Sequence, residues 1–238
     1  MNKGYALLLS LTFVGCSSVT QVSSTVGILE PGGTLSVIAA QSTVNVYKPA
    51  IGDPSDRYTI AASINTKGAP PAPPSIHRAG NGIVVNAPDP LYALLVRLPE
   101  KTNLVVQTQH GNINVTDVAG NVDVNAGVGN VKVMVPGYAQ ASAQTGNVDV
   151  TIGATQWPGV LHFSSRSGDV NVYVPETAKF HVRMHTDDGT LFTDFGLTGS
   201  ANGTSETIDA NVNGGSTYGL DIVSHHGTVR LLRLAPQA

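Results

Sequence analysis

Apolar and polar residues alternate with a period of two along much of the chain. The clearest stretches each follow a glycine: GNINV from Gly111, GNVKVMV from Gly129, GNVDVTI from Gly146 and GDVNVYV from Gly168. Val or Ile fills one set of alternate positions, and mostly Asn, Asp or Lys fills the other. Because successive side chains of a strand point to opposite faces, this pattern predicts β-strands with one buried and one wet side. No comparable run with helical spacing follows the first sixteen residues, so we predict an all-β protein.

The same Gly-x-Val-x-Val unit recurs at irregular intervals. Further copies begin at Gly120, Gly189 and Gly227, and a degenerate copy begins at Ser42. Before the glycine the alternation runs in the opposite phase, as in Leu161, Phe163 and Ser165 ahead of Gly168. A glycine at a corner would explain this change of phase, because glycine tolerates positive φ and close backbone approach.

Several strands close with a proline, at Pro99, Pro136 and Pro175, and proline stops a hydrogen-bonded ladder. The repeating unit is therefore strand, glycine corner, strand and proline turn. Such units can stack into a solenoid, in which neighbours bury what one unit cannot. We predict a single-domain, β-helix-like β-solenoid over residues 34–238, with Asn112, Asn121 and Asn130 stacked in one column. Hairpins of a β-sandwich would alternate similarly and remain the other interpretation.

The N-terminal segment looks like a lipoprotein leader. Lys3 is followed by a short apolar run, YALLLSLTFVG, which ends at Cys16, the one cysteine of the chain. This run is too short for a membrane-spanning helix, which needs about 20 residues, and is typical of a secretory signal. FVGC resembles the bacterial lipobox, although Phe13 stands where Leu is usual. We predict a lipoprotein signal peptide over residues 1–15, lipidation of Cys16, and a flexible Ser/Thr/Gly-rich tether over residues 16–33; an ordinary signal peptide with an incidental cysteine is the alternative.

The amino-acid composition argues against several classes of function. The 238 residues carry a net charge of −3, and only 12% of them are charged. The absence of any basic run argues against nucleic-acid binding, which needs clustered Lys and Arg. A single cysteine excludes an intramolecular disulfide, a thiolate zinc cluster and an iron–sulfur site.

The chain has seven histidines, but their spacing does not predict a metal site. His181 and His185 would lie about 13 Å apart on a strand, at about 3.3 Å per residue. His225 and His226 precede the corner at Gly227, where stacking could create at most a weak metal patch. We predict no metal and no cofactor.

No catalytic residue is assigned either. Asp149 and Asp169 could approach one another across adjacent coils, as a glycosidase pair would have to, but so could many exposed carboxylates. Among the aromatic residues, Phe192 falls in the outward phase, whereas Phe163 and Phe180 fall in the inward phase. An exposed aromatic ladder would suit glycan or protein binding; packing at edges and caps is the alternative.

Four segments resemble a known bacterial family: VRLPEKTNLVVQTQHGNINV, VNAGVGNVKVMVP, SAQTGNVDV and SSRSGDVNVYVP. They are similar to a "putative adhesin" family of β-strand-repeat proteins, a domain of unknown function, and IDANVNGGSTYGLDIVSHHGTVRL is similar to its closing unit. The resemblance covers about residues 34–234. It implies a β-solenoid-like domain, often secreted or lipid-anchored, and it implies no established catalytic residues.

These observations predict a lipid-anchored cell-envelope protein with a non-catalytic, adhesin-like domain for binding or scaffolding. We expect it at the membrane through Cys16, at the outer membrane in a Gram-negative host, with a surface glycan or an envelope protein as partner. An enzyme acting on cell-wall or surface polysaccharide is the alternative. Terminal strands of a solenoid could also pair with another chain, because they are open edges unless capped.

Overall fold

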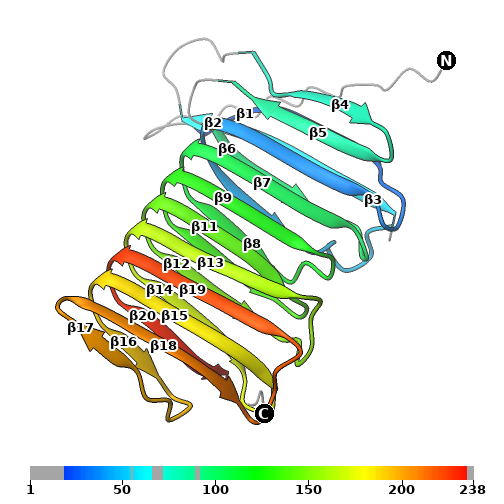
Figure 1. Ribbon diagram of the computed structural model, residues 1–238. Coiled ribbons are helices and arrows are strands. Elements are labelled where there is room, and N and C mark those ends of the chain that lie inside the picture. Colours follow the sequence, from blue (N-terminus) through cyan, green and yellow to red (C-terminus); the bar gives the residue numbers. More distant parts are fainter. Residues whose placement is uncertain (1–18, 55, 66–71, 89–91, 235–238) are drawn as a thin grey trace.

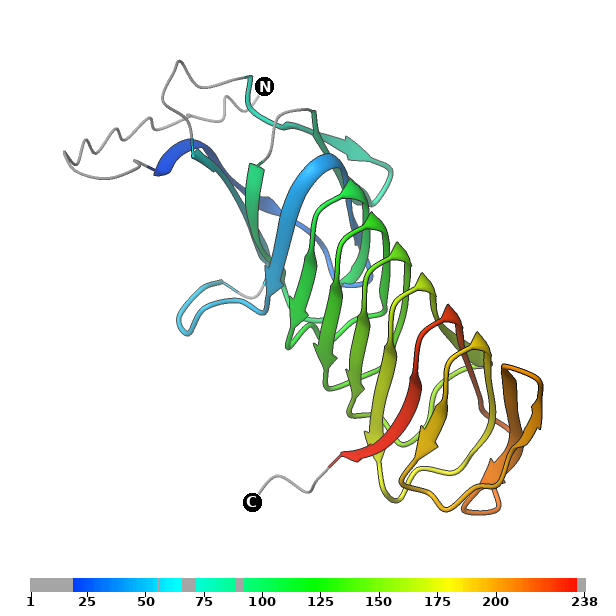
Figure 2. The same ribbon diagram turned by 90° about the vertical axis from the view of Figure 1, so that its left-hand side faces the viewer.

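A computed structural model describes residues 19–54, 56–65, 72–88 and 92–234, and the described part of the chain is built from β-strands without a helix. The strands form an elongated solenoid with two long faces, here called sheet A and sheet B (Figures 1 and 2). This confirms the predicted all-β, β-solenoid class. Within the described residues no helix is long and apolar enough to cross a membrane.

Sheet A contains ten strands. In spatial order they are β1 (Val19–Ile28), β3 (Arg57–Asn65), β6 (Tyr92–Arg97), the second part of β2 (Thr34–Tyr47), β8 (Ile113–Thr116), β10 (Val131–Val135), β12 (Val148–Ile152), β14 (Val170–Pro175), β20 (Val229–Leu234) and β16 (Leu191–Thr193). From β6 to β16 all pairs are parallel, whereas β1 and β3 cap the N-terminal end in antiparallel fashion.

Sheet B contains eleven strands. In spatial order they are β4 (Ser75–Ala79), β5 (Gly82–Ala87), the first part of β2, β7 (Asn103–His110), β9 (Val122–Val128), β11 (Ala139–Thr145), β13 (Val160–Ser167), β19 (Gly219–His226), β15 (Phe180–Asp188), β18 (Ser205–Val212) and β17 (Ser200–Asn202). The antiparallel pairs are again at the two ends.

The core lies between the two sheets, where the alternate apolar positions of both point. In sheet A, Val115, Val133, Val150, Val172 and Leu231 occupy one register position of successive strands, and all are buried. Small β-branched side chains suit this narrow interior because they pack well on a pleated surface. The solenoid therefore needs few aromatic residues in its centre.

A column of glycines forms one corner, as the change of phase predicts. In spatial order it runs Gly111, Gly129, Gly146, Gly168, Gly227 and Gly189, and the first five have φ between +135° and +152°. A Cβ on Gly129 would lie 2.2 Å from the carbonyl oxygen of Gly111 in the next coil. Only glycine fits a corner where backbone meets backbone so closely.

Asparagines extend this corner by hydrogen bonds from one coil to the next. The side-chain oxygen of Asn112 accepts the N–H of Asn130 at 2.8 Å, Asn130 accepts that of Asn147 at 2.9 Å, and Asn147 accepts that of Asp169 at 2.9 Å. The predicted column is therefore correct for Asn112 and Asn130 but wrong for Asn121. That residue lies at the opposite corner, where its N–H donates to Asn103 Oδ1 at 3.2 Å.

The misplacement of Asn121 has a geometric cause. The nine-residue spacing of Gly111, Gly120 and Gly129 is half a coil, so the strand after Gly120 joins sheet B whereas the strands after Gly111 and Gly129 join sheet A. One full coil here takes 18 residues, and its two halves share the Gly-Asn signature at opposite corners.

Two coils are inserted out of sequence order. The coil β19–β20 lies between β13–β14 and β15–β16, although it follows both in the chain; Figure 2 shows it as a red loop within the row. Likewise β2 lies between β5–β6 and β7–β8. Short or antiparallel strands occupy the ends of the two sheets.

The predicted flexible tether is wrong over most of its length. Residues Val19–Ile28 form β1 along the whole of β3, and Leu29 is fully buried in the core. The segment contains Ser and Thr, but it also has Val22, Val26 and Ile28, and long-range pairing decides its state. The folded body therefore begins at β1. The signal peptide predicted at residues 1–15 and Cys16 lie outside the described residues.

Candidate functional site

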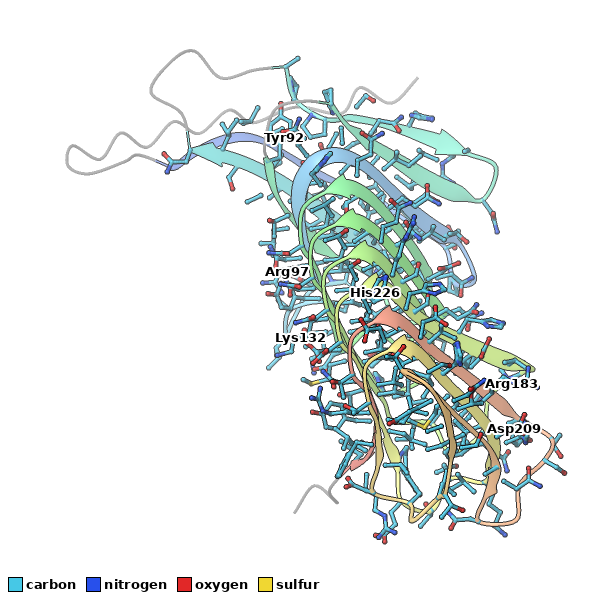
Figure 3. The ribbon with its side chains drawn as sticks, turned by 60° about the vertical axis from the view of Figure 1, so that its left-hand side comes forward. Tyr92, Arg97, Lys132, Arg183, Asp209 and His226 are labelled. Carbon is cyan, nitrogen blue, oxygen red and sulfur yellow. The ribbon has the colours of Figure 1, made fainter. Side chains whose placement is uncertain are left out.

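The outer faces of the two sheets carry the polar chemistry of the described chain. Figure 3 shows Arg97 and Lys132 projecting from sheet A, and Arg183 and Asp209 projecting from sheet B on another side of the solenoid. The outward positions of sheet A include Asn45, whose side chain accepts a hydrogen bond from Asn114 at 3.0 Å. Sheet B concentrates histidine and aspartate towards its C-terminal end.

This histidine–aspartate face is built from strands β13, β19, β15 and β18. In adjacent strands, His162 Nδ1 lies 3.2 Å from Asp221 Oδ2, and Arg183 Nε lies 3.3 Å from Asp209 Oδ2. His181 Nε2 also lies 3.2 Å from Asp209, at its other oxygen. The register of two parallel pairs, β13–β19 and β15–β19, and of the antiparallel pair β15–β18 places His162, Asp221, Arg183 and Asp209 in one row across four strands.

A second part of this face lies at the glycine corner, where Asp187 bridges two histidines. Its Oδ1 lies 2.8 Å from His185 Nε2, and its Oδ2 lies 2.5 Å from His225 Nδ1. His226 and Asp188 form a looser neighbouring pair, 3.8 Å apart. His225 and His226 thus meet Asp187 and Asp188 because β19 and β15 are paired in register.

The pKa of the Asp187 carboxyl is lowered from its ordinary value. Hydrogen bonds from His225 and then His185 are the main causes, since both favour the ionised carboxylate. The pKa of Asp169, at the corner of sheet A, is lowered as well. There burial acts to raise it, but the Thr228 N–H and the Arg230 guanidinium together outweigh that effect. Arg230 Nη1 lies 2.9 Å from Asp169 Oδ2.

The two carboxylates considered as a glycosidase pair therefore have different surroundings. Asp169 is bound to Arg230 and to the backbone of the next coil, whereas Asp149 accepts a hydrogen bond from Asn171 at 2.6 Å. The lowered pKa of Asp169 is opposite to the raised pKa that a general acid for glycoside cleavage needs.

A hollow lies at the opposite, N-terminal end of sheet B. It is an open groove of about 460 Å³ over β2, β5, β7 and β9, flanked by Pro73 and Pro88. Its remaining lining residues are amide, hydroxyl and small aliphatic side chains: Ile38, Ala39, Ala40, Ser75, Asn86, Ala87, Gln107, Thr108, Gln109 and Asn125. Such a lining offers hydrogen bonds to an uncharged polar ligand.

The aromatic side chains of Trp157 and Phe195 pack against other aromatic rings of the protein. Trp157 is buried, donates its Nε1–H to the Gly219 carbonyl at 2.9 Å, and lies 5.6 Å from the Phe180 ring. Phe195 packs edge-on against Phe180 and under Arg233. Phe163 and Phe180 are buried and Phe192 is exposed, as predicted. Trp157, Phe180 and Phe195 therefore pack together near the C-terminal end of the solenoid, whereas Phe192 is exposed.

Sequence reasoning missed the histidine–aspartate face as a unit. His162 and Asp221 are 59 residues apart, and no local spacing connects them. Within the described part of the chain, no group of three or more His, Cys, Asp or Glu residues is placed to hold a metal ion. The lipidation residue, Cys16, lies outside that part, so its prediction stays a prediction.

Two solved structures of bacterial proteins are similar to this chain at low sequence identity. A "putative cell adhesion protein" from Clostridium sporogenes ATCC 15579 shares 11% identity with a TM-score of 0.49, covering 90% of this chain and all of that one. A "putative adhesin" from Bacteroides fragilis NCTC 9343 shares 8% identity with a TM-score of 0.39, covering 92% of this chain and 99% of that one. The curated proteins contain no match to the chain.

The family is shown by the sequence itself. The model of the family described as Toastrack DUF4097 matches residues 100–232, which is more than half of the chain. The matched range runs from β7 to β20 and thus contains the glycine column and the histidine–aspartate face. It confirms the resemblance drawn from the repeat segments, and the chain belongs to the Toastrack DUF4097 family.

Proposed function

We propose that the protein is a lipid-anchored component of the bacterial cell envelope, whose solenoid is a non-catalytic body for binding or scaffolding. The position of Cys16 relative to the fold carries the proposal. Only Ser17 and Ser18 separate this cysteine, the last residue of the lipobox-like FVGC, from Val19, where β1 begins. Three residues span at most about 10 Å. A lipid on Cys16 would therefore hold the solenoid close to the membrane by its β1 end.

Such an anchor would present the rest of the solenoid to the surroundings. Sheet A has ten described strands, counting β1 and β16, which lie at opposite ends of the sheet (Figure 1). Nine spacings of about 4.8 Å place these edges about 43 Å apart. The histidine–aspartate face belongs to the far half of the solenoid, and the open groove of sheet B belongs to the half near β1.

We propose a non-catalytic role because the carboxylates of the histidine–aspartate face are paired with basic side chains. Asp187, Asp209 and Asp221 each contact a histidine. The pKa values of Asp169 and Asp187 are lowered, which is opposite to the shift of a general acid. Paired charges and amides at regular spacings suit repeated hydrogen bonding to a partner. We propose a surface glycan as the partner, because hydroxyl groups match the amide-lined groove.

The anchor is tested by comparing the full-length protein with Cys16→Ser in a bacterial host. The neighbouring substitution Ser18→Ala serves as the matched control, since it leaves the cysteine in place. We expect the wild type and the control in the membrane fraction, with an intact mass that begins at Cys16 and includes diacylglycerol and a fatty acyl group. Cys16→Ser should stay unlipidated. An unmodified wild type, or one cut elsewhere, overturns the lipoprotein proposal.

A further inference from the structure

The described solenoid ends in four edge strands, and three of them have features that discourage pairing with another chain. In sheet A, β16 has only three residues; in sheet B, β17 also has three, and β4 carries His77 and Arg78. Short edges and charged edges are the usual means by which proteins prevent strand addition. Strand β1 has neither feature.

Strand β1 is long and uncharged. Its ten residues, VTQVSSTVGI, contain no Lys, Arg, Asp, Glu or Pro. Among the described residues it pairs with β3 alone, antiparallel from Val19 opposite Asn65 to Ile28 opposite Arg57, with a register shift between Gln21 and Ser23. The ladder from Ser23 to Ile28 is regular. With respect to the described residues, the opposite side of its backbone is thus a free edge.

The hydrogen-bonding phase shows which residues face that free edge. Leu29 donates its N–H to the Asp56 carbonyl at 3.0 Å and so belongs to the side that faces β3. Because the ladder alternates, Ile28, Val26 and Ser24 direct their backbone groups the other way. Arg78 Nη2 donates to the Ile28 carbonyl at 3.1 Å and occupies one end of the edge. The outward backbone groups of Val26 and Ser24 have no partner among residues 19–54, 56–65, 72–88 and 92–234.

Exposed apolar side chains accompany these backbone groups. Val26 is 57% exposed and Ile28 is 48% exposed, on the outer face of sheet A. A strand added to β1 would cover part of both side chains and satisfy the free backbone groups together. An unpaired edge of this length without charges is a template for another strand.

We propose that β1 is a homotypic interface, at which two copies of the chain pair their β1 strands antiparallel about a two-fold axis. A second copy fits because an uncharged strand meets itself without like-charge repulsion, and because the same edge on both copies gives a closed dimer. The two A sheets then join into one continuous sheet, with the solenoids pointing in opposite directions. The inference goes beyond the proposed function and does not depend on it.

The proposed anchor would reinforce this pairing. Strand β1 begins at Val19, three residues after Cys16, so a lipid on Cys16 would hold the β1 edges of different copies at the same height above the membrane. Confinement of this kind raises the effective concentration and favours a small interface. Without the anchor we expect a weak dimer, because one pair of strands buries less surface than a standard stable interface.

The test is sedimentation velocity of the full chain carrying Cys16→Ser, over a range of protein concentrations. Cys16→Ser removes any acyl group, so the outcome is independent of the lipoprotein proposal. We expect a monomer–dimer equilibrium without larger species. Val26→Lys should weaken the dimer by about tenfold or more, since it brings like charges together across the two-fold axis. Ile51→Lys is the matched control, because it adds the same charge at a fully exposed apolar site between β2 and β3.

Hydrogen exchange on the unsubstituted β1 gives a readout that needs no edge variant. The amides of Ser24 and Val26 should become protected as the protein concentration rises, while those of the β2–β3 loop should not. A monomer at all concentrations, larger polymers, or equal dimerisation of the Val26→Lys and Ile51→Lys variants would overturn the proposal. Unchanged exchange in β1 would overturn it as well.

Discussion

The glycine corner allows a strong prediction about stability. Gly129 has a φ of +147°, and a Cβ there would lie 2.2 Å from the Gly111 carbonyl oxygen and 2.6 Å from its carbon. The obstacle is backbone, which cannot rotate away as a side chain could. Moving it would disturb the bonds from Gly111 N–H to Val128 and from Gly129 N–H to Thr145. Gly129→Ala therefore perturbs two coils at once.

The expected loss can be estimated from two contributions. A non-glycine residue in this region of φ and ψ costs about 1–3 kcal/mol, and forcing an extra methyl group into a packed contact costs about 1–3 kcal/mol. We expect Gly129→Ala to lower the free energy of unfolding by about 3 kcal/mol or more. Gly137→Ala is the control: no heavy atom lies within 4 Å of its Cβ position, and its φ is not positive. It should change stability by about 0.5 kcal/mol at most.

Urea unfolding followed by circular dichroism measures both variants. Fluorescence of Trp157 gives a second, local probe, because this buried tryptophan is the only one in the chain and lies in the C-terminal half. Coils of a solenoid need not unfold together, so the two probes should be compared before a single free energy is quoted. If Gly129→Ala and Gly137→Ala unfolded at the same urea concentration, the account of the corner would be refuted.

Two further predictions concern the outer face of sheet B. Asp187 has a lowered pKa in the folded state, so its contribution to stability should be complete above the ordinary carboxyl pKa of about 4 and be lost as the pH falls through the lowered value. On the acid side, the Tm of Asp187→Asn should therefore fall less steeply with decreasing pH than the Tm of the wild type. Identical slopes for the two proteins would contradict this role of Asp187. The double variant Gln107→Ala and Asn125→Ala removes amides from the groove and should reduce retention on isolated cell-wall polysaccharide. The control variant Lys132→Ala, on sheet A, should be retained like the wild type. Equal retention of the wild type, the double variant and the control would contradict a glycan site in the groove.

The local features of the fold could be predicted from the sequence because they depend on neighbouring residues. Alternation around Val131, Val133 and Val135 gives the strand and its buried side, and the change of phase across Gly129 gives the corner. Pro136 ends the strand by removing a backbone donor. These signals repeat along the chain, so the class of fold followed from them even though single copies are short.

The tether shows where local reasoning failed. Composition alone made residues 16–33 look flexible, because Ser, Thr and Gly dominate. The segment becomes a strand because β3 offers it a complete antiparallel ladder about forty residues further along the chain. Pairing of this kind depends on the partner, and strand propensity depends strongly on such context.

The sequence by itself determined that this protein is an all-β repeat with glycine corners, because period and phase are local properties of the chain. Only the tertiary structure decided the order of the coils, with β19–β20 inserted beside β15–β16. It also decided which charges meet, as in the contact of Asp187 with His225. Similar valine-rich strands, such as β10, β12 and β14, can pair in many orders at similar local energy. The choice therefore depends on how the whole stack buries its core and closes its ends.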